Sequence, residues 1–225
     1  MQQLFSKLQI ARHFVTILRD ISDTESIFKL IETLNRQEDL QARFPETPAM
    51  SAYLDASFLQ GFPALEDLRA MPEGSLGRAL AVHMDTLGVD FSQFDRKPAP
   101  QDRIEQIERH VEETHDIWHV LTGFDTGPAS EFGLQAFGLA QIKAVGPLML
   151  VILGLARCLK TGSQEIAPIM DALTEGWRMG RATEPLYGTD FRPYLVRPLD
   201  EVRAHFGIEP IEPNRLAEIP EQIAA

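Results

Sequence analysis

The sequence has a single cysteine, Cys158, among its 225 residues, so it cannot form an internal disulfide. Such cysteine usage is typical of reducing compartments, and we expect a cytoplasmic protein rather than a secreted one. Positive charge is scarce as well: 21 lysines and arginines stand against 33 aspartates and glutamates, for a net charge of −12. Nucleic acids attract basic surfaces, so this balance argues against a nucleic-acid partner.

Long apolar runs are also missing. No segment reaches the roughly 18 apolar residues of a membrane-spanning helix, and the N-terminus has no apolar stretch of signal-peptide length. The nearest approach is AVGPLMLVILGLA, residues 144–156. It is too short to cross a bilayer and too apolar for a surface helix, so we predict an apolar central helix.

Alternating strand patterns with hairpin turns are absent, whereas apolar residues recur at helical spacing. Helices are predicted at about 75–88, 101–122, from 129, 147–160, 164–180, and before Gly207. Ser75 is the expected N-cap of the first of these, and Gly88, Gly123 and Gly207 are expected stops. The prediction is an all-α fold: one mainly helical domain over 1–207 with long Pro- and Gly-containing loops, then an extended tail over 208–225.

The segment ETHDIWHVLTGFDTGPASE, residues 113–131, combines four potential metal ligands. His115 and His119 are four residues apart and share a helix face, with Asp116 beside them. After the turn at Gly123, Glu131 falls in the first turn of the next helix. Two imidazoles and two carboxylates suit Zn²⁺ or Fe²⁺, while Mg²⁺ prefers more oxygen. The alternative is a surface helix and a polar loop, in which the aspartate only orients a histidine.

This motif, H-D-x-x-H followed after eleven residues by E, resembles the signature of the Coq4 family of ubiquinone biosynthesis. The likeness extends to MPEGSLGRAL (71–80) and to PLYGTDFRPYLVRPLDEVRAHFGI (185–208). Many members carry glycine just before the glutamate. Here the residue is Ser130, which we expect to act as a helix N-cap.

The resemblance implies a helical protein that holds a divalent metal, with zinc the first choice and iron or magnesium the alternatives. Its ligands would be His115, Asp116, His119 and Glu131, with Asp116 either a ligand or a carboxylate partner of a ligating histidine. No catalytic residue is indicated.

The resemblance also implies peripheral membrane association and binding of a prenylated quinone precursor or another isoprenoid lipid. The family is linked to oxidative decarboxylation at C1 of the aromatic head group and to organising other quinone-biosynthesis proteins. Two alternatives therefore stand: a metal-dependent decarboxylase, and a non-catalytic lipid-binding scaffold with a structural metal. A helical HD-type phosphohydrolase ranks last, because its other motifs are not recognisable around His83 and Asp171.

The apolar helix supplies candidate lipid contacts. Leu148, Val151, Ile152 and Leu155 share one face, and we predict that this face lines a channel for the isoprenoid chain; packing in an ordinary core is the alternative. Near the N-terminus, an apolar stripe that includes Leu4, Leu8, Ala11, Val15 and Leu18 fits either a homo-oligomer or membrane contact. His13, His83, His110 and His205 have no carboxylate at ligand spacing and are taken as ordinary side chains.

Overall fold

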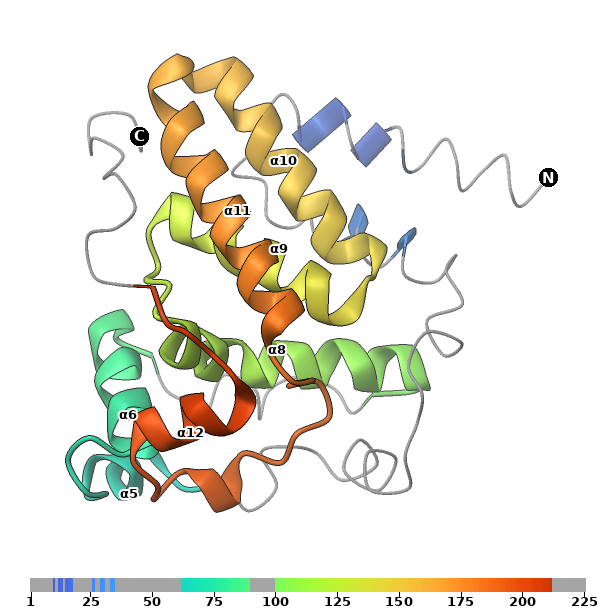
Figure 1. The fold of residues 1–225 in the computed structure, drawn as a ribbon. Coiled ribbons are helices and arrows are strands. Elements are labelled where there is room, and N and C mark those ends of the chain that lie inside the picture. Colours follow the sequence, from blue (N-terminus) through green and yellow to red (C-terminus); the bar gives the residue numbers. More distant parts are fainter. Residues whose placement is uncertain are drawn as a thin grey trace. The chain divides into compact units, whose positions relative to one another are not determined.

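The computed structural model describes residues 62–89 and 100–211, together with scattered positions between Ile10 and Leu34. Within these residues every regular element is a helix, and the β-bridge between Ser75 and Pro198 is isolated. The all-α fold class predicted from the sequence is confirmed (Figure 1). In the described part of the chain, no helix is both long and apolar enough to cross a membrane.

The elements follow one another as α5 (Leu65–Arg69), α6 (Leu76–Leu87), α8 (Arg103–Thr122), α9 (Pro128–Ile142), α10 (Val145–Thr161), η1 (Ser163–Glu165), α11 (Ile166–Ala182), η2 (Arg192–Tyr194) and α12 (Leu199–Phe206). The predicted helix ends are confirmed. α6, α8 and α12 stop at Gly88, Gly123 and Gly207, whose φ angles of 66°, 78° and 68° are left-handed. Glycine adopts this conformation without the steric cost of a Cβ. The Ser75 side chain caps α6 by accepting the Arg78 N–H at 3.2 Å.

Contacts gather the described helices into two compact units. One contains α5, α6, α8, η2 and α12, and the other contains α9, α10, η1 and α11 with the described N-terminal positions. The single domain over 1–207 stays a prediction. At the start of the predicted tail, Ile208 and Ile211 are buried, and the Ile211 N–H donates to the Thr122 carbonyl at 2.8 Å. Residues 212–225 lie outside the described part.

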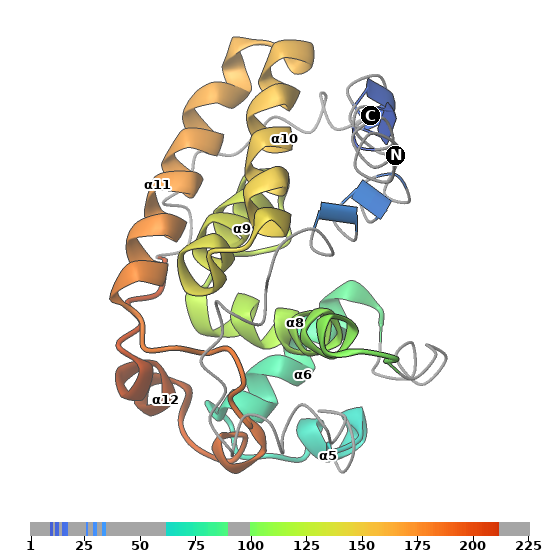
Figure 2. The ribbon, with the colours of Figure 1, turned by 90° about the vertical axis from the view of Figure 1, so that its right-hand side faces the viewer.

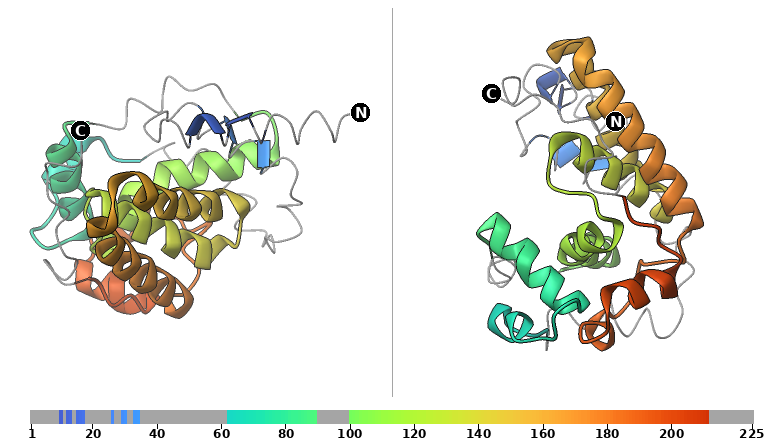
Figure 3. Two further views of the ribbon diagram at one scale, coloured as in Figure 1. Left: turned by 90° about the horizontal axis from the view of Figure 1, so that it is seen from above. Right: turned by 60° about the vertical axis from the view of Figure 1, so that its left-hand side comes forward.

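In the first unit, α8 packs against both α6 and α12, as the right-hand view of Figure 3 shows. Fully or almost fully buried side chains come from all three helices: Leu76, Leu80, Met84, Ile117, Leu121, Val202 and Phe206. Arg203 of α12 donates from Nε to the Leu121 carbonyl at 3.0 Å and from Nη2 to the Val120 carbonyl at 2.9 Å. The last carbonyls of a helix lack intrahelical partners, so Arg203 fixes the C-terminal turn of α8.

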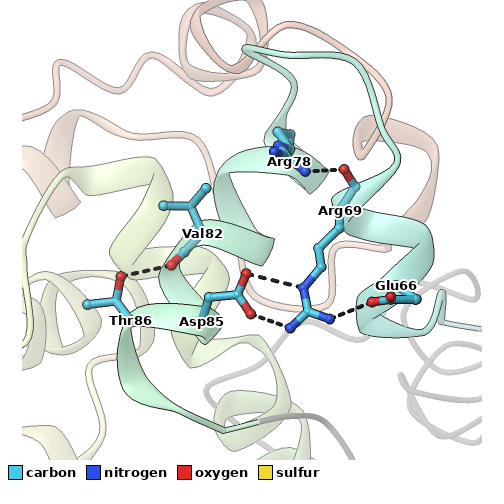
Figure 4. A network of polar contacts seen from close by, with 6 residues as sticks. All are labelled: Glu66, Arg69, Arg78, Val82, Asp85 and Thr86. Carbon is cyan, nitrogen blue, oxygen red and sulfur yellow. Dashed lines mark hydrogen bonds and ion pairs between the residues drawn. The ribbon is translucent and has the colours of Figure 1, made fainter.

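A polar network joins α5 to α6 in the same unit (Figure 4). The Arg69 guanidinium forms a two-pronged contact with Asp85, with Nε 3.2 Å from Oδ2, and also reaches Glu66. The hydrogen bonds from Arg69 hold the pKa of the Asp85 carboxyl below its ordinary value. Arg78 donates to the Arg69 carbonyl, so the network fixes the end of α5 beside α6.

In the second unit, α9 is the helix on which both α10 and α11 pack (Figure 2). A Cβ on Gly176 of α11 would lie 1.9 Å from the Gly133 carbonyl oxygen of α9, and one on Gly180 would lie 2.6 Å from the Phe137 carbonyl oxygen. These glycines therefore allow the two backbones to touch. On α10, a Cβ on Gly154 would meet the Phe132 ring at 2.6 Å.

The apolar helix α10 packs with one side and exposes the other. Leu153 is buried in a cluster with Ile17 and Leu30. Leu148, Ile152 and Leu155 are 42%, 37% and 41% exposed, and Leu159 is 89% exposed. Of the predicted N-terminal stripe, Val15 is described and is half-exposed, while Leu4, Leu8, Ala11 and Leu18 lie outside the described residues.

Candidate metal centre

His115 and His119 lie in the last two turns of α8. The helix begins at Asp102, whose side chain accepts the Glu105 N–H at 2.9 Å, and it ends at Gly123. The two imidazole rings meet edge to face, with centroids 4.6 Å apart and planes at 77°. His119 is buried and His115 is half-buried. The two imidazoles therefore lie on the same face of α8, as their spacing of four residues predicted.

The His119 ring has a defined orientation. Its Nδ1 lies 2.9 Å from the carbonyl oxygen of Phe124, in the turn that follows α8. A carbonyl can only accept, so Nδ1 carries a proton, and in the neutral ring Nε2 then keeps its lone pair. A ligating histidine commonly donates its other N–H to a carbonyl or carboxylate in this way. His119 is thus prepared to bind a cation through Nε2.

Glu131 lies in the first turn of α9, which opens at Gly127 with Pro128 as its first residue. The Glu131 N–H donates to the Gly127 carbonyl at 2.9 Å, and an acidic side chain is favoured at this end of a helix. Ser130 is not the N-cap that the sequence suggested, because Gly127 takes that position; Ser130 is buried inside the helix.

Two of the four predicted ligands, His115 and His119, come together within one unit, on the last turns of α8. Glu131 belongs to the other unit, in the first turn of α9, and its place beside the two histidines stays a prediction. Two imidazoles with one carboxylate are a donor set that divalent zinc accepts in catalytic sites, where a further coordination position is open to water or substrate. By the chemistry of their donor atoms, these residues fit the metal that the sequence resemblance implies.

Asp116, the fourth predicted ligand, faces a different partner. Its Oδ1 lies 3.2 Å from Nε2 of His83, which belongs to α6. Burial acts to raise the pKa of the Asp116 carboxyl, but the hydrogen bond from His83 and the nearby charges of His115, His83 and His119 together hold it below its ordinary value. The carboxylate therefore stays ionised in a mostly buried position.

His83 is the residue that the sequence did not single out. Besides its bond to Asp116, its ring stacks on the His119 ring, with centroids 5.3 Å apart and planes at 25°. Its partner is 33 residues away along the chain, so no local spacing revealed the pair. The available signal was the position of His83 beside Met84, which lies on the buried side of α6.

The predicted lipid contacts share the outer side of α10. Leu148, Ile152 and Leu155 are exposed there, and Val151 is half-buried. Leu159 extends the same apolar stripe towards the end of the helix. These side chains form an exposed apolar stripe along several turns of α10.

Known proteins resemble this chain over most of its length. Residues 12–212 match the family model "Coenzyme Q (ubiquinone) biosynthesis protein Coq4". The mitochondrial ubiquinone biosynthesis protein coq4 of Talaromyces stipitatus is 32% identical over 152 residues, covering 63% of this chain and 49% of that protein. The corresponding Aspergillus flavus protein is 29% identical over 166 residues, covering 69% of this chain and 53% of that protein.

The chain thus spans about half the length of the curated relatives it matches. Among solved structures, a protein of Nostoc punctiforme PCC 73102 assigned to ubiquinone biosynthesis superposes with a TM-score of 0.75 at 26% identity. That match covers 89% of this chain and 97% of the other. The resemblance seen in the His-Asp motif is confirmed, and the chain belongs to the Coq4 family of ubiquinone biosynthesis proteins.

Proposed function

We propose that this protein binds a divalent metal through His115, His119 and Glu131 and acts on a prenylated precursor of ubiquinone or a related quinone. The observation that carries the proposal is the pair of imidazoles at the end of α8, with centroids 4.6 Å apart, in which the Phe124 carbonyl holds the His119 proton on Nδ1. Zinc is the first choice of metal, since two nitrogens and one oxygen match its preferences, and iron is the alternative.

A metal with a coordination position left for substrate would support the enzymatic alternative, oxidative decarboxylation at C1 of the aromatic head group, in which a hydroxyl replaces the carboxylate and dioxygen is the two-electron oxidant. When bound, the metal would act as a Lewis acid that binds the substrate carboxylate and stabilises charge developing as CO₂ leaves. The protein's own groups hold the histidines in place: Arg203 fixes the end of α8, and Phe124 orients His119.

The exposed apolar stripe of α10 supports the lipid part of the proposal. Leu148, Ile152 and Leu155 present a continuous apolar side to solvent. Exposed stripes of this kind mark sites that bind apolar partners. We propose that the stripe receives the isoprenoid chain and that the protein associates peripherally with membranes, where such precursors reside.

The test is release of labelled CO₂ from a prenylated aromatic acid carrying ¹³C in its carboxyl group, in the presence of oxygen. The proposal predicts release by the metal-loaded protein, loss in His119→Ala, and retention in His205→Ala, which removes an exposed histidine of α12. Binding of metal and lipid without any release would instead support the non-catalytic scaffold. Failure to bind either would refute both.

A further inference from the structure

The end of α8 that carries His119 is held by residues from much further along the chain. The last four carbonyls of a helix have no donor within the helix. In α8 the first of the four is satisfied locally, because the Gly123 N–H donates to the His119 carbonyl at 2.9 Å. The next two are satisfied by one side chain: Arg203 donates to the Val120 carbonyl at 2.9 Å and to the Leu121 carbonyl at 3.0 Å. Two of the four carbonyls therefore depend on a residue of α12.

The fourth carbonyl, and the turn that follows it, lie against the backbone of Ile211. The Ile211 N–H donates to the Thr122 carbonyl at 2.8 Å, and the Ile211 side chain is buried. Gly123 packs directly on this segment, because a Cβ there would lie 2.9 Å from the Ile211 carbonyl oxygen and 3.4 Å from Cβ of Pro210. The turn at Gly123 is thus confined between α8 and residues 210–211.

This turn determines how the His119 ring is held. Phe124 follows Gly123 directly and is 2% exposed, and its carbonyl accepts the His119 Nδ1–H at 2.9 Å. The carbonyl can orient the ring only where the turn itself is fixed. A ring that is already oriented loses less rotational freedom when it binds a metal, so the donors that hold the turn contribute to metal affinity.

We propose that Arg203 is a positioning residue for the metal site: together with the Ile211 backbone it holds the turn at Gly123, so that the Phe124 carbonyl keeps the His119 ring in its binding orientation. The inference rests on the proposed function, since it presupposes a metal bound through His119. All of these contacts lie within one compact unit, which contains α8, α12 and the segment that follows α12.

The chain offers a matched control for Arg203. Arg197, just before α12, pairs with Glu201 of that helix at 3.5 Å, as Arg203 pairs with Asp200 at 3.3 Å. Both acidic side chains are exposed, so neither ion pair adds much to stability. Arg203 differs by its two hydrogen bonds to α8 carbonyls. A comparison of the two arginines therefore isolates the effect of those bonds.

Cobalt(II) titration of the metal-free full chain tests the proposal, with visible absorption reporting the coordination of the ion and circular dichroism showing that each variant is folded. We expect Arg203→Met to bind Co²⁺ about tenfold more weakly and with a changed spectrum, a loss typical of removing support from a metal ligand. Arg203→Lys, whose ammonium can still donate to an α8 carbonyl, should recover part of the affinity. Arg197→Met should keep the affinity and the spectrum of the wild type.

A second control separates positioning from a general loss of stability. Leu68→Ala leaves a cavity at a fully buried position of α5 in the same unit and removes no donor to α8, so it should keep the wild-type affinity. Wild-type affinity in Arg203→Met, or an equal loss in Leu68→Ala, would overturn the inference while the proposed function stands. If the folded wild type binds no Co²⁺, the proposed function itself is wrong and the inference falls with it.

Discussion

Protonation of His110 should destabilise the protein as the pH falls below neutrality. His110 lies on the buried side of α8, is 3% exposed, and accepts the Gly188 N–H at Nε2 over 2.9 Å. Its ring meets Tyr187 edge to face, with centroids 5.1 Å apart. Burial lowers the pKa of His110 from 6.5 to about 3. Protonation would also remove the acceptor for Gly188.

The sign follows from proton binding in the two states. Between pH 6.5 and about 3 the unfolded chain binds a proton at His110 and the folded chain does not. The contribution of the neutral His110 side chain to the free energy of unfolding is therefore fully present above pH 6.5 and is lost as the pH falls. From these two pKa values, the free energy of unfolding should decrease by about 2 kcal/mol between pH 7 and pH 5 through this residue alone.

The assay is urea unfolding, followed by circular dichroism, at several pH values between 7.5 and 5. The variant is His110→Gln, which stays neutral and can still accept a hydrogen bond. The readout is the slope of the free energy of unfolding against pH, and not the stability of the variant at pH 7. We expect the free energy of unfolding of His110→Gln to fall less steeply with pH, by the amount above. Equal slopes in the wild type and His110→Gln would refute the reasoning.

Three further changes have defined outcomes. Gly176→Ala should lower the free energy of unfolding by about 2 kcal/mol in urea titrations, because overpacking against the Gly133 backbone outweighs the gain in helix propensity; stability equal to Thr174→Ala, an exposed control on α11, would contradict this. Arg203→Met should lower the melting temperature by removing the donor to two α8 carbonyls, and an unchanged melting temperature would show that water replaces it. Leu155→Gln should reduce the prenyl lipid recovered by organic extraction while metal content is kept, and joint loss of both would indicate unfolding instead.

The helices were predictable because their signals are local. Ser75 at the start of α6 and Gly88 at its end act within one turn, so the sequence determines them without knowledge of the fold. The i, i+4 spacing of His115 and His119 is local in the same sense. The prediction that Ser130 is an N-cap was wrong. Serine caps many helices, but here α9 begins one turn earlier, at Gly127 and Pro128.

What depends on packing between distant segments was not predictable. His83 finds Asp116 on another helix, and no periodicity in one sequence encodes that pairing. An evenly apolar helix such as α10 gives no indication of which side is buried. The structure shows Leu153 packed in a cluster and Leu155 exposed, two residues further along.

The central claim is that His115, His119 and Glu131 hold a metal, and metal content measures it most directly. Protein purified without chelators would be analysed by inductively coupled plasma mass spectrometry beside His119→Ala and His205→Ala. We predict about one equivalent of zinc or iron per chain in the wild type and in His205→Ala, and its loss in His119→Ala. Wild-type protein without stoichiometric metal, or full metal content in His119→Ala, would contradict the account.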